Sequence, residues 1–332
     1  MRHSIYILTA IFILFLQIPG ELYASVLYSP KDSVSSNLNE SVYLLTDRNL
    51  YIVGEKVLFS AVILSSPSWG EYDWSRVLYL ELVGTEGEPK VQTKHLIVDF
   101  RSNGYLRLPE NILTGIYYLK AYTRWMQNFS SSTFAWIRIK IINPFQPGMV
   151  NAYQADDDSG EERKGALYKN VTEDWISCKA DKAVYYQHEE VTLNMSIPEV
   201  NNRLSGKYCI TVIRPDAIDT INYGTRGLRI DKRAKNFPLK YIPDIRGLSL
   251  TGRVIDKYTG QGVSQAHTRL SVLNKEADYS SYITIEDGSF FFALKHFTGT
   301  TDMYITVDPD DDREMEILVD TEYANDNLSF TH

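Results

Sequence analysis

The chain has 332 residues, of which 44% are hydrophobic and 12% aromatic, and its formal net charge is −8. This length and composition indicate a folded protein of two or three domains. Because an acidic chain offers no large basic surface for a phosphate backbone, we do not expect nucleic acid as a partner.

The chain begins with the layout of a secretory signal peptide. Basic Arg2 precedes an apolar run over residues 5–18, and small Ala24 precedes Ser25. The run is shorter than the roughly twenty residues that a membrane-spanning helix needs. We therefore predict that residues 1–24 are a signal peptide. The mature chain is then exported to the periplasm, the outer membrane or the cell surface, without a transmembrane span.

Most of the mature chain alternates apolar and polar residues with a period of two, which is typical of half-buried strands. Runs rich in β-branched and aromatic residues predict strands at residues 78–83, 94–98, 116–122, 136–142 and 191–197. No helix of twelve or more residues is expected. Short strands between frequent turn signals indicate antiparallel sandwiches, so the predicted fold class is all-β.

One short pattern occurs twice. The stretch TDRNLYIVGEKVLF, residues 46–59, has an echo 134 positions downstream in ADKAVYYQHEEVTL, residues 180–193. An acid, a base, an aromatic residue, a second acid and a valine recur in step, which in the first copy are Asp47, Arg48, Tyr51, Glu55 and Val57. Internal similarity of this kind indicates two related domains. We interpret each copy as a corner in which the acid and the base cap and orient the strands.

The backbone of this corner can be predicted in more detail. In the first copy we expect one strand over residues 43–51, a reversal at Val53-Gly54 with positive φ, and a second strand from Val57. His188 stands where the first copy has Gly54. The same backbone shape would therefore place about 1 kcal/mol of strain on His188.

A loop-like stretch, SSPSWGEYDWSR at residues 65–76, carries three aromatic residues outside any alternating face: Trp69, Tyr72 and Trp74. We take them as the candidate binding residues, a surface on which glycans or peptides could stack. The alternative is ordinary packing in the core and at strand edges.

Composition places the domain boundaries. We expect a first sandwich over residues 40–145, a linker or long loop over 146–172, a second sandwich over 173–235 and a third over 246–320. The linker contains GEERKG at residues 160–165, with the glycine spacing of a phosphate-binding loop. Ala166 occupies the position of its essential lysine, so we read a solvated loop.

The two cysteines flank the second copy of the pattern. Cys178 and Cys209 lie 31 positions apart. In an oxidising compartment they can pair, and closing that loop would contribute about 3–4 kcal/mol. The alternative is two buried free thiols that act as small hydrophobic side chains. The sequence leaves both alternatives open.

Two stretches raise the question of metal binding. His188 and Glu189 begin a zinc-protease pattern, but Thr192 stands where the second histidine would be. The acidic run DPDDDRE at residues 308–314 lacks the spacing of a defined calcium loop. We therefore expect no metal site and no cofactor.

The third domain restarts at Leu248 with a strand, a glycine-rich turn and a second strand. Residues 286–289, EDGS, predict a tight hairpin turn. After it, Phe290, Phe292 and Leu294 are expected on one face.

These stretches resemble known families. TDRNLYIVGEKVLFSAVI and LTGIYYLKAYTRWMQNF, residues 113–129, resemble macroglobulin-type β-sandwich domains of exported Bacteroidetes proteins. YIPDIRGLSLTGRVID, with the later TIEDGSFFF, is similar to carboxypeptidase regulatory-like domains. The resemblance implies tandem antiparallel β-sandwiches, two of them macroglobulin/Ig-like and one prealbumin-like.

The resemblance also bears on function. Macroglobulin-type inhibitors use a thioester from a Cys-Gly-Glu-Gln run, and neither cysteine here is followed by that run. We expect a non-catalytic exported protein that acts by protein or glycan interaction at the cell envelope, as an accessory to outer-membrane transport. Its expected partners are envelope or outer-membrane proteins, glycans or proteases.

The sequence also raises two alternative functions. A protease inhibitor without a thioester would need a bait segment, for which residues 153–168 are the candidate. An enzyme with a regulatory-like accessory domain would need a catalytic domain, and no unassigned segment is large enough.

Overall fold

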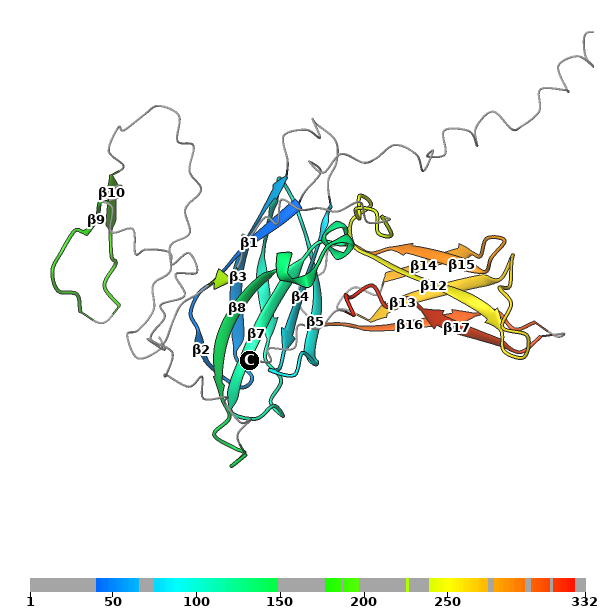
Figure 1. The fold of residues 1–332 in the computed structure, drawn as a ribbon, viewed down its shortest axis with the longest axis horizontal. Coiled ribbons are helices and arrows are strands. Elements are labelled where there is room, and N and C mark those ends of the chain that lie inside the picture. Colours follow the sequence, from blue (N-terminus) through cyan, green and yellow to red (C-terminus); the bar gives the residue numbers. More distant parts are fainter. Residues whose placement is uncertain are drawn as a thin grey trace, which may run out of the picture.

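The computed structural model describes residues 40–65, 75–148, 177–186, 188–196, 225–226, 239–273, 278–295, 300–310 and 313–325. Over these residues the regular structure is β-strand, apart from short 3-10 turns at Trp125–Asn128 and Ser131–Thr133. The strands form two sandwiches and a separate hairpin (Figure 1). This arrangement confirms the predicted all-β class with tandem antiparallel sandwiches.

Two sheets packed face to face form the first sandwich. One has the order β1-β3-β6, with β1 at Glu40–Thr46, β3 at Lys56–Ser65 and β6 at Arg101–Arg107. The other has the order β11-β8-β7-β4-β5, with β4 at Val77–Val83, β5 at Pro89–Leu96, β7 at Gly115–Tyr122, β8 at Ala135–Ile142 and β11 at Thr225–Arg226. The predicted strands at 78–83, 116–122 and 136–142 are confirmed.

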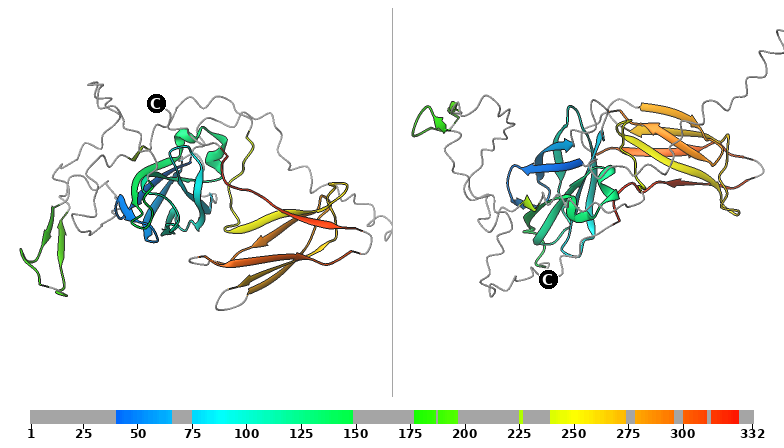
Figure 2. Two further views of the ribbon diagram at one scale, coloured as in Figure 1. Left: turned by 90° about the horizontal axis from the view of Figure 1, so that it is seen from below. Right: turned by 45° about the horizontal axis from the view of Figure 1, so that its top comes forward.

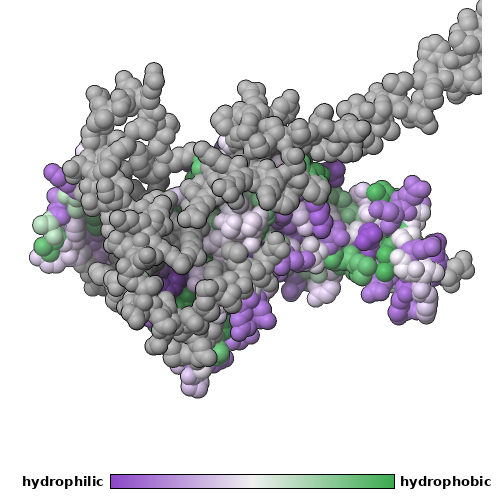
Figure 3. All heavy atoms as spheres, viewed as in Figure 1, coloured by the Kyte–Doolittle hydropathy of each residue, from purple (hydrophilic) through white to green (hydrophobic). Residues whose placement is uncertain are grey.

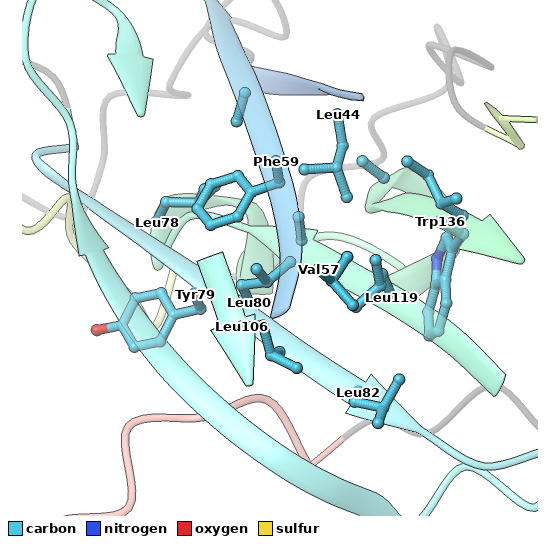
Figure 4. Close-up of a cluster of buried hydrophobic side chains, with 14 of the residues drawn as sticks. Leu44, Val57, Phe59, Leu78, Tyr79, Leu80, Leu82, Leu106, Leu119 and Trp136 are labelled. Carbon is cyan, nitrogen blue, oxygen red and sulfur yellow. The ribbon is translucent and has the colours of Figure 1, made fainter. Parts of the chain in front are cut away.

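The core lies between these two sheets. Alternate residues of β3 point inward, including Val57 and Phe59, and they meet Leu78, Leu80 and Leu82 from β4 (Figure 4). All five side chains are at most 5% exposed. β4 is buried on both faces, because every residue from Val77 to Val83 is buried. Something must therefore cover its outer face as well.

The chain changes sheets within the first copy of the repeated pattern. We predicted one strand over residues 43–51. The structure breaks it after Thr46, and the next strand, β2 at Leu50–Ile52, pairs in parallel with β8 of the opposite sheet. Gly54 then takes φ +80, as predicted, and the chain returns as β3. The pattern thus builds a corner that ties both sheets together.

A separate hairpin carries the second copy. β9 at Ser177–Ala180 pairs antiparallel with β10 at Leu193–Ser196, and it lies apart from both sandwiches in Figures 1 and 2. β11, which falls in the range predicted for the second sandwich, pairs with Trp136 and Ile137 of β8 in the first sandwich. The remainder of that predicted sandwich lies outside the described residues.

The third domain is also a sandwich of two sheets. Their orders are β15-β12-β17 and β14-β13-β16, with β12 at Ser249–Asp256, β13 at His267–Leu273, β14 at Asp278–Ile283, β15 at Ser289–Ala293, β16 at Asp302–Val307 and β17 at Met315–Val319. Its core includes Val254, Leu270, Phe290 and Phe292, all at most 2% exposed. Phe290, Phe292 and Leu294 pack on one core, as predicted.

The predicted turn at residues 286–289 forms, but it joins two sheets and does not close a hairpin. Gly288 has φ +81, and an added Cβ would lie 2.3 Å from the carbonyl oxygen of Val254. β15 pairs with β12 and not with β14. The reason lies at Thr284, whose hydroxyl donates to the Val263 oxygen at 2.6 Å and accepts from the Ala266 amide at 2.8 Å. These bonds hold the residue after β14 to the loop at residues 263–266, which precedes β13.

Candidate functional site

The first copy of the repeated pattern is held by one carboxylate. Asp47 Oδ1 accepts the hydroxyl hydrogen of Tyr51 at 2.7 Å and the backbone amide of Leu58 at 3.1 Å. Glu55 Oε2 accepts the backbone amide of Ile52 at 2.7 Å. The two acids of the pattern therefore satisfy backbone donors where the chain leaves one sheet and enters the other.

The second copy makes the same bonds. Asp181 Oδ1 accepts from the Tyr185 hydroxyl at 2.7 Å and from the Thr192 amide at 2.9 Å. Glu189 Oε2 accepts from the Tyr186 amide at 2.9 Å. Equal bonds at equal positions confirm that the repeated residues cap and orient a strand corner.

The two corners differ in burial. Tyr51 is 1% exposed, and burial, reinforced by the neighbouring Asp47 carboxylate, raises the pKa of its phenol. Tyr185 is only half-buried, and Tyr186 is 82% exposed. His188 has φ +64, so the second corner keeps the left-handed backbone of Gly54 and carries the predicted strain.

A polar cluster lies where the first and third sandwiches meet. Two segments reach from the third sandwich to the outer face of the sheet that contains β4 and β7: residues 239–248, before β12, and residues 320–325, after β17 (Figure 2). We call this cluster the joint.

Glu322 is a central residue of the joint. Its carboxylate, with a side chain 4% exposed, forms an ion pair with Lys94 on β5. It also accepts from the hydroxyls of Thr251 at 3.0 Å and Tyr79 at 3.3 Å. The Glu322 carbonyl accepts from Nε2 of Gln127 at 2.9 Å. One residue thus binds the first sandwich through three side chains while it holds β12 of the third.

Tyr79 contacts both segments of the joint. Its hydroxyl donates to Asp244 at 2.7 Å, and its ring meets Tyr323 edge to face with centroids 5.5 Å apart. The ring is directed away from the core of the first sandwich (Figure 4). Asp244 also faces Arg124, with 3.4 Å between Oδ1 and Nη1. Burial raises the pKa of the Asp244 carboxyl despite these partners.

A buried ion pair lies under the C-terminal segment. Lys120 Nζ stands 2.9 Å from Glu81 Oε1, and the two side chains are 0% and 2% exposed. Tyr122 donates to the same Glu81 oxygen at 2.7 Å, and its own oxygen accepts the backbone amide of Ala324 at 2.8 Å. The Ala324 carbonyl accepts from Lys120 at 3.3 Å. The segment therefore covers the outer face of β4 and completes the hydrogen bonds of its charges.

The charged groups of the joint are paired with one another: Lys94 with Glu322, Lys120 with Glu81 and Arg124 with Asp244. Among the described residues, no three of His, Cys, Asp or Glu gather closely enough to hold a metal ion.

Sequence reasoning did not single out the joint. A signal was present, because Glu81 and Lys120 stand in the middle of the apolar runs VLYLELV and GIYYLKAY. A charge inside such a strand is costly unless it is paired, so each residue required a partner. Glu81 and Lys120 are each other's partner, because they stand opposite one another in the register of β4 and β7.

The predicted site residues lie largely outside the described part of the chain. Trp69, Tyr72 and Trp74 are all outside it, as is Cys209. Cys178 lies on β9, where its backbone pairs with Met195, and its side chain is not described. The binding and disulfide predictions therefore remain predictions.

The two metal candidates have other partners. Glu189 forms an ion pair with Lys182 in the second corner. In the acidic run, Asp308 pairs with Arg269 and Asp310 with Arg313.

Within the residues that the structure covers, no helix is long and apolar enough to cross a bilayer.

No protein-family model matches the chain, and no curated protein does. Among solved structures, trypsin-activated alpha-2-macroglobulin from Escherichia coli matches at 6% identity over 84% of this chain and 15% of that chain, with a TM-score of 0.25. Salmonella alpha-2-macroglobulin reacted with methylamine matches at 9% identity over 84% of this chain and 23% of that chain, also with a TM-score of 0.25.

A third match is a tetra-tandem repeat from the extending region of a large adhesion protein, at 8% identity over 81% of this chain and 74% of that chain, with a TM-score of 0.20. The chain spans less than a quarter of the two macroglobulin chains. At such scores the matches assign no family, and the β-sandwich fold rests on the strand pairing described above.

Proposed function

We propose that this chain is a non-catalytic, exported β-sandwich protein that acts by binding proteins or glycans at the cell envelope, as an accessory to outer-membrane transport. The observation that supports it is the joint. Buried charges are a large cost in a fold, and here they are used to fix one sandwich against another. Such an arrangement suits a protein that presents surfaces and sheet edges at a set spacing.

The sequence supports two parts of this proposal, the cellular location and the types of the domains. The signal-peptide layout of residues 1–24 favours export. The resemblance to macroglobulin-type and regulatory-like domains of Bacteroidetes proteins favours an envelope role. We include both in the proposal: the first sandwich is macroglobulin-like, and the third is prealbumin-like.

Crosslinking in native envelopes, followed by purification of this chain, tests the proposal. We expect outer-membrane transport components to be recovered. A variant with a loosened joint, Glu322→Ala, should recover less of them while it is still exported. Recovery of extracellular proteases alone would instead favour the second candidate, a protease inhibitor without a thioester. In that case, cleavage within residues 153–168 should reduce protease activity.

A further inference from the structure

The outer face of the sheet β14-β13-β16 carries two tyrosines in one row. Ser271 of β13 pairs with Tyr279 of β14 on one side and with Tyr304 of β16 on the other. Directly opposed residues of antiparallel strands point to the same face. Tyr279, Ser271 and Tyr304 therefore form a line across the three strands, which we call the tyrosine row.

The tyrosine row faces away from the core. The neighbours of Ser271 along β13, Leu270 and Val272, are 1% and 3% exposed and belong to the core. Side chains alternate between faces along a strand, so Ser271 and its partners point outward. Tyr279 is 60% exposed and Tyr304 is 56% exposed. Both aromatic rings are thus open to solvent on one surface.

The backbone sets the spacing of the two tyrosines. Neighbouring strands lie about 4.8 Å apart, so positions two strands apart are separated by about 9.6 Å. This separation is close to that of alternate sugar rings in an extended β-1,4-linked chain. Two sugars of one chain could then each meet one aromatic ring, with an intervening sugar over Ser271.

The surroundings of the row are mixed in character, because exposed Leu273 pairs with exposed Asp302 on one side of it. In the adjacent row, exposed Ser281 and Thr306 flank Arg269. The charge of Arg269 is compensated by Asp308, whose Oδ2 lies 2.6 Å from Nη2. In the view of Figure 3, apolar and hydrophilic residues are intermixed over the third sandwich. Aromatic and aliphatic side chains beside hydroxyl groups suit a glycan chain, because its sugar rings have apolar faces and hydroxyl-bearing edges.

We propose that the outer face of β14-β13-β16 binds an extended, neutral, β-linked glycan chain, with Tyr279 and Tyr304 as stacking residues. Ser271, Ser281 and Thr306 supply hydroxyl groups for the sugar edges. This inference rests on the proposed role as an envelope binding protein, and it names a ligand class and a site that differ from the predicted Trp69, Tyr72 and Trp74 surface.

Affinity electrophoresis of the purified whole chain tests the proposal, with hydroxyethylcellulose in the gel as a neutral β-1,4-glucan and pullulan as an α-linked comparison. Titration calorimetry with cellohexaose gives the affinity. We expect retardation by the β-glucan only. Tyr279→Ala and Tyr304→Ala should each weaken cellohexaose binding about tenfold, which corresponds to about 1.4 kcal/mol. The matching phenylalanine variants should keep binding.

Tyr258→Ala is the matched control, because Tyr258 is 79% exposed on the same sandwich but lies in the turn after β12. It should bind like the unaltered chain. Far-ultraviolet circular dichroism and thermal unfolding confirm that each variant is folded. The proposal is overturned if the unaltered chain binds no β-glucan, or if Tyr258→Ala weakens binding as much as the row variants. Self-association that the row variants abolish would likewise overturn it, since it would assign the face to a second copy of the chain.

The envelope crosslinking separates this inference from the function on which it rests. If Tyr279→Ala and Tyr304→Ala keep the envelope partners while no glycan binds, only the glycan site fails. If no envelope partner is recovered but β-glucan binding is lost in the row variants, the glycan site stands without the transport role.

Discussion

Tyr79 donates its hydroxyl hydrogen to Asp244 at 2.7 Å, although 165 positions of sequence separate the two residues. Tyr79 belongs to the first sandwich and Asp244 to the segment that leads into the third. The contact shows how the outer face of β4 is used: side chains on that face hold a neighbouring domain, while side chains on the inner face hold the core.

The ion pair between Glu322 and Lys94 should be needed for the joint. Glu322→Ala leaves Lys94 without its carboxylate in a largely buried place, and we expect the free energy of unfolding to fall by about 3 kcal/mol. Urea unfolding followed by tryptophan fluorescence measures it. Glu88→Ala removes the exposed partner of Lys90 and should change stability by less than about 1 kcal/mol. Equal effects of the two variants would contradict the prediction.

Removing one charge of the buried pair of Glu81 and Lys120 should lower the free energy of unfolding more than removing both. Lys120→Met leaves an uncompensated carboxylate in a dry place and should cost about 3–5 kcal/mol. Adding Glu81→Gln removes that charge and should restore most of the loss. Urea unfolding of the unaltered chain and of these two variants gives the comparison. A double variant as unstable as Lys120→Met would show that the pair matters through packing and not through charge.

Glu40 should make stability fall as pH rises. Burial raises the pKa of this carboxyl above 4.5, even though Thr123 and Ser75 donate hydrogen bonds to it. The folded chain then binds more protons than the unfolded one, so the free energy of unfolding decreases as pH rises from about 4.5 through the folded pKa.

Glu40→Gln keeps the shape of the side chain and removes this titration. The stability of the variant relative to the unaltered chain should therefore increase with pH over that window, as measured by urea midpoints at a series of pH values. The raised pKa of Asp244 acts in the same direction and remains in both proteins. Parallel pH profiles would rule out the assignment to Glu40.

The two copies of the corner should differ in their effect on the first sandwich. Asp47→Ala removes the acceptor of the Leu58 amide and leaves the buried Tyr51 hydroxyl with the Arg48 carbonyl alone, which should cost about 1–3 kcal/mol. Asp181→Ala breaks the same bonds in the exposed hairpin and should leave the urea midpoint of the first sandwich unchanged. A shift with Asp181→Ala would show that the hairpin packs on that sandwich.

The strained backbone of His188 gives a test confined to the second corner. His188→Gly relieves the left-handed conformation and should stabilise the hairpin by about 1 kcal/mol. Slower hydrogen exchange at the Asp181 and Thr192 amides, which bond within the hairpin, would report it. Unchanged exchange would mean that the strain relieved in the folded hairpin is cancelled by the larger conformational entropy that glycine gives the unfolded chain.

The strands of the first sandwich could be predicted where β-branched and aromatic residues dominate, as in β4, β7 and β8. β6 could not, because its outward positions are Arg101, Asn103 and Arg107 and its run contains Gly104. The sheet change after Thr46 was also missed. It depends on a side-chain acceptor, Asp47, and not on a change in hydrophobic period.

The joint depends on contacts between residues far apart in sequence, which no local pattern reports. Glu81 and Lys120 were visible as charges in apolar strands, but the residues that cover them, at 322–324, lie in a polar segment with no period of its own. The candidate residues Trp69, Tyr72 and Trp74 were chosen because they break an alternating face. That reasoning finds exposed aromatic residues in loops, and it overlooks those, such as Tyr279 and Tyr304, that stand on the solvent side of a regular sheet.

The position of Glu322 has a consequence for the order of folding. It lies 228 positions after Lys94, so the contact can form only after all residues from 94 to 322 have been synthesised. Because domains generally fold as units, we expect the first sandwich to condense while the outer face of β4 is still exposed to water, and to dock with the third sandwich afterwards. Until docking, Glu81 and Lys120 are expected to remain hydrated, so that this face carries charged groups.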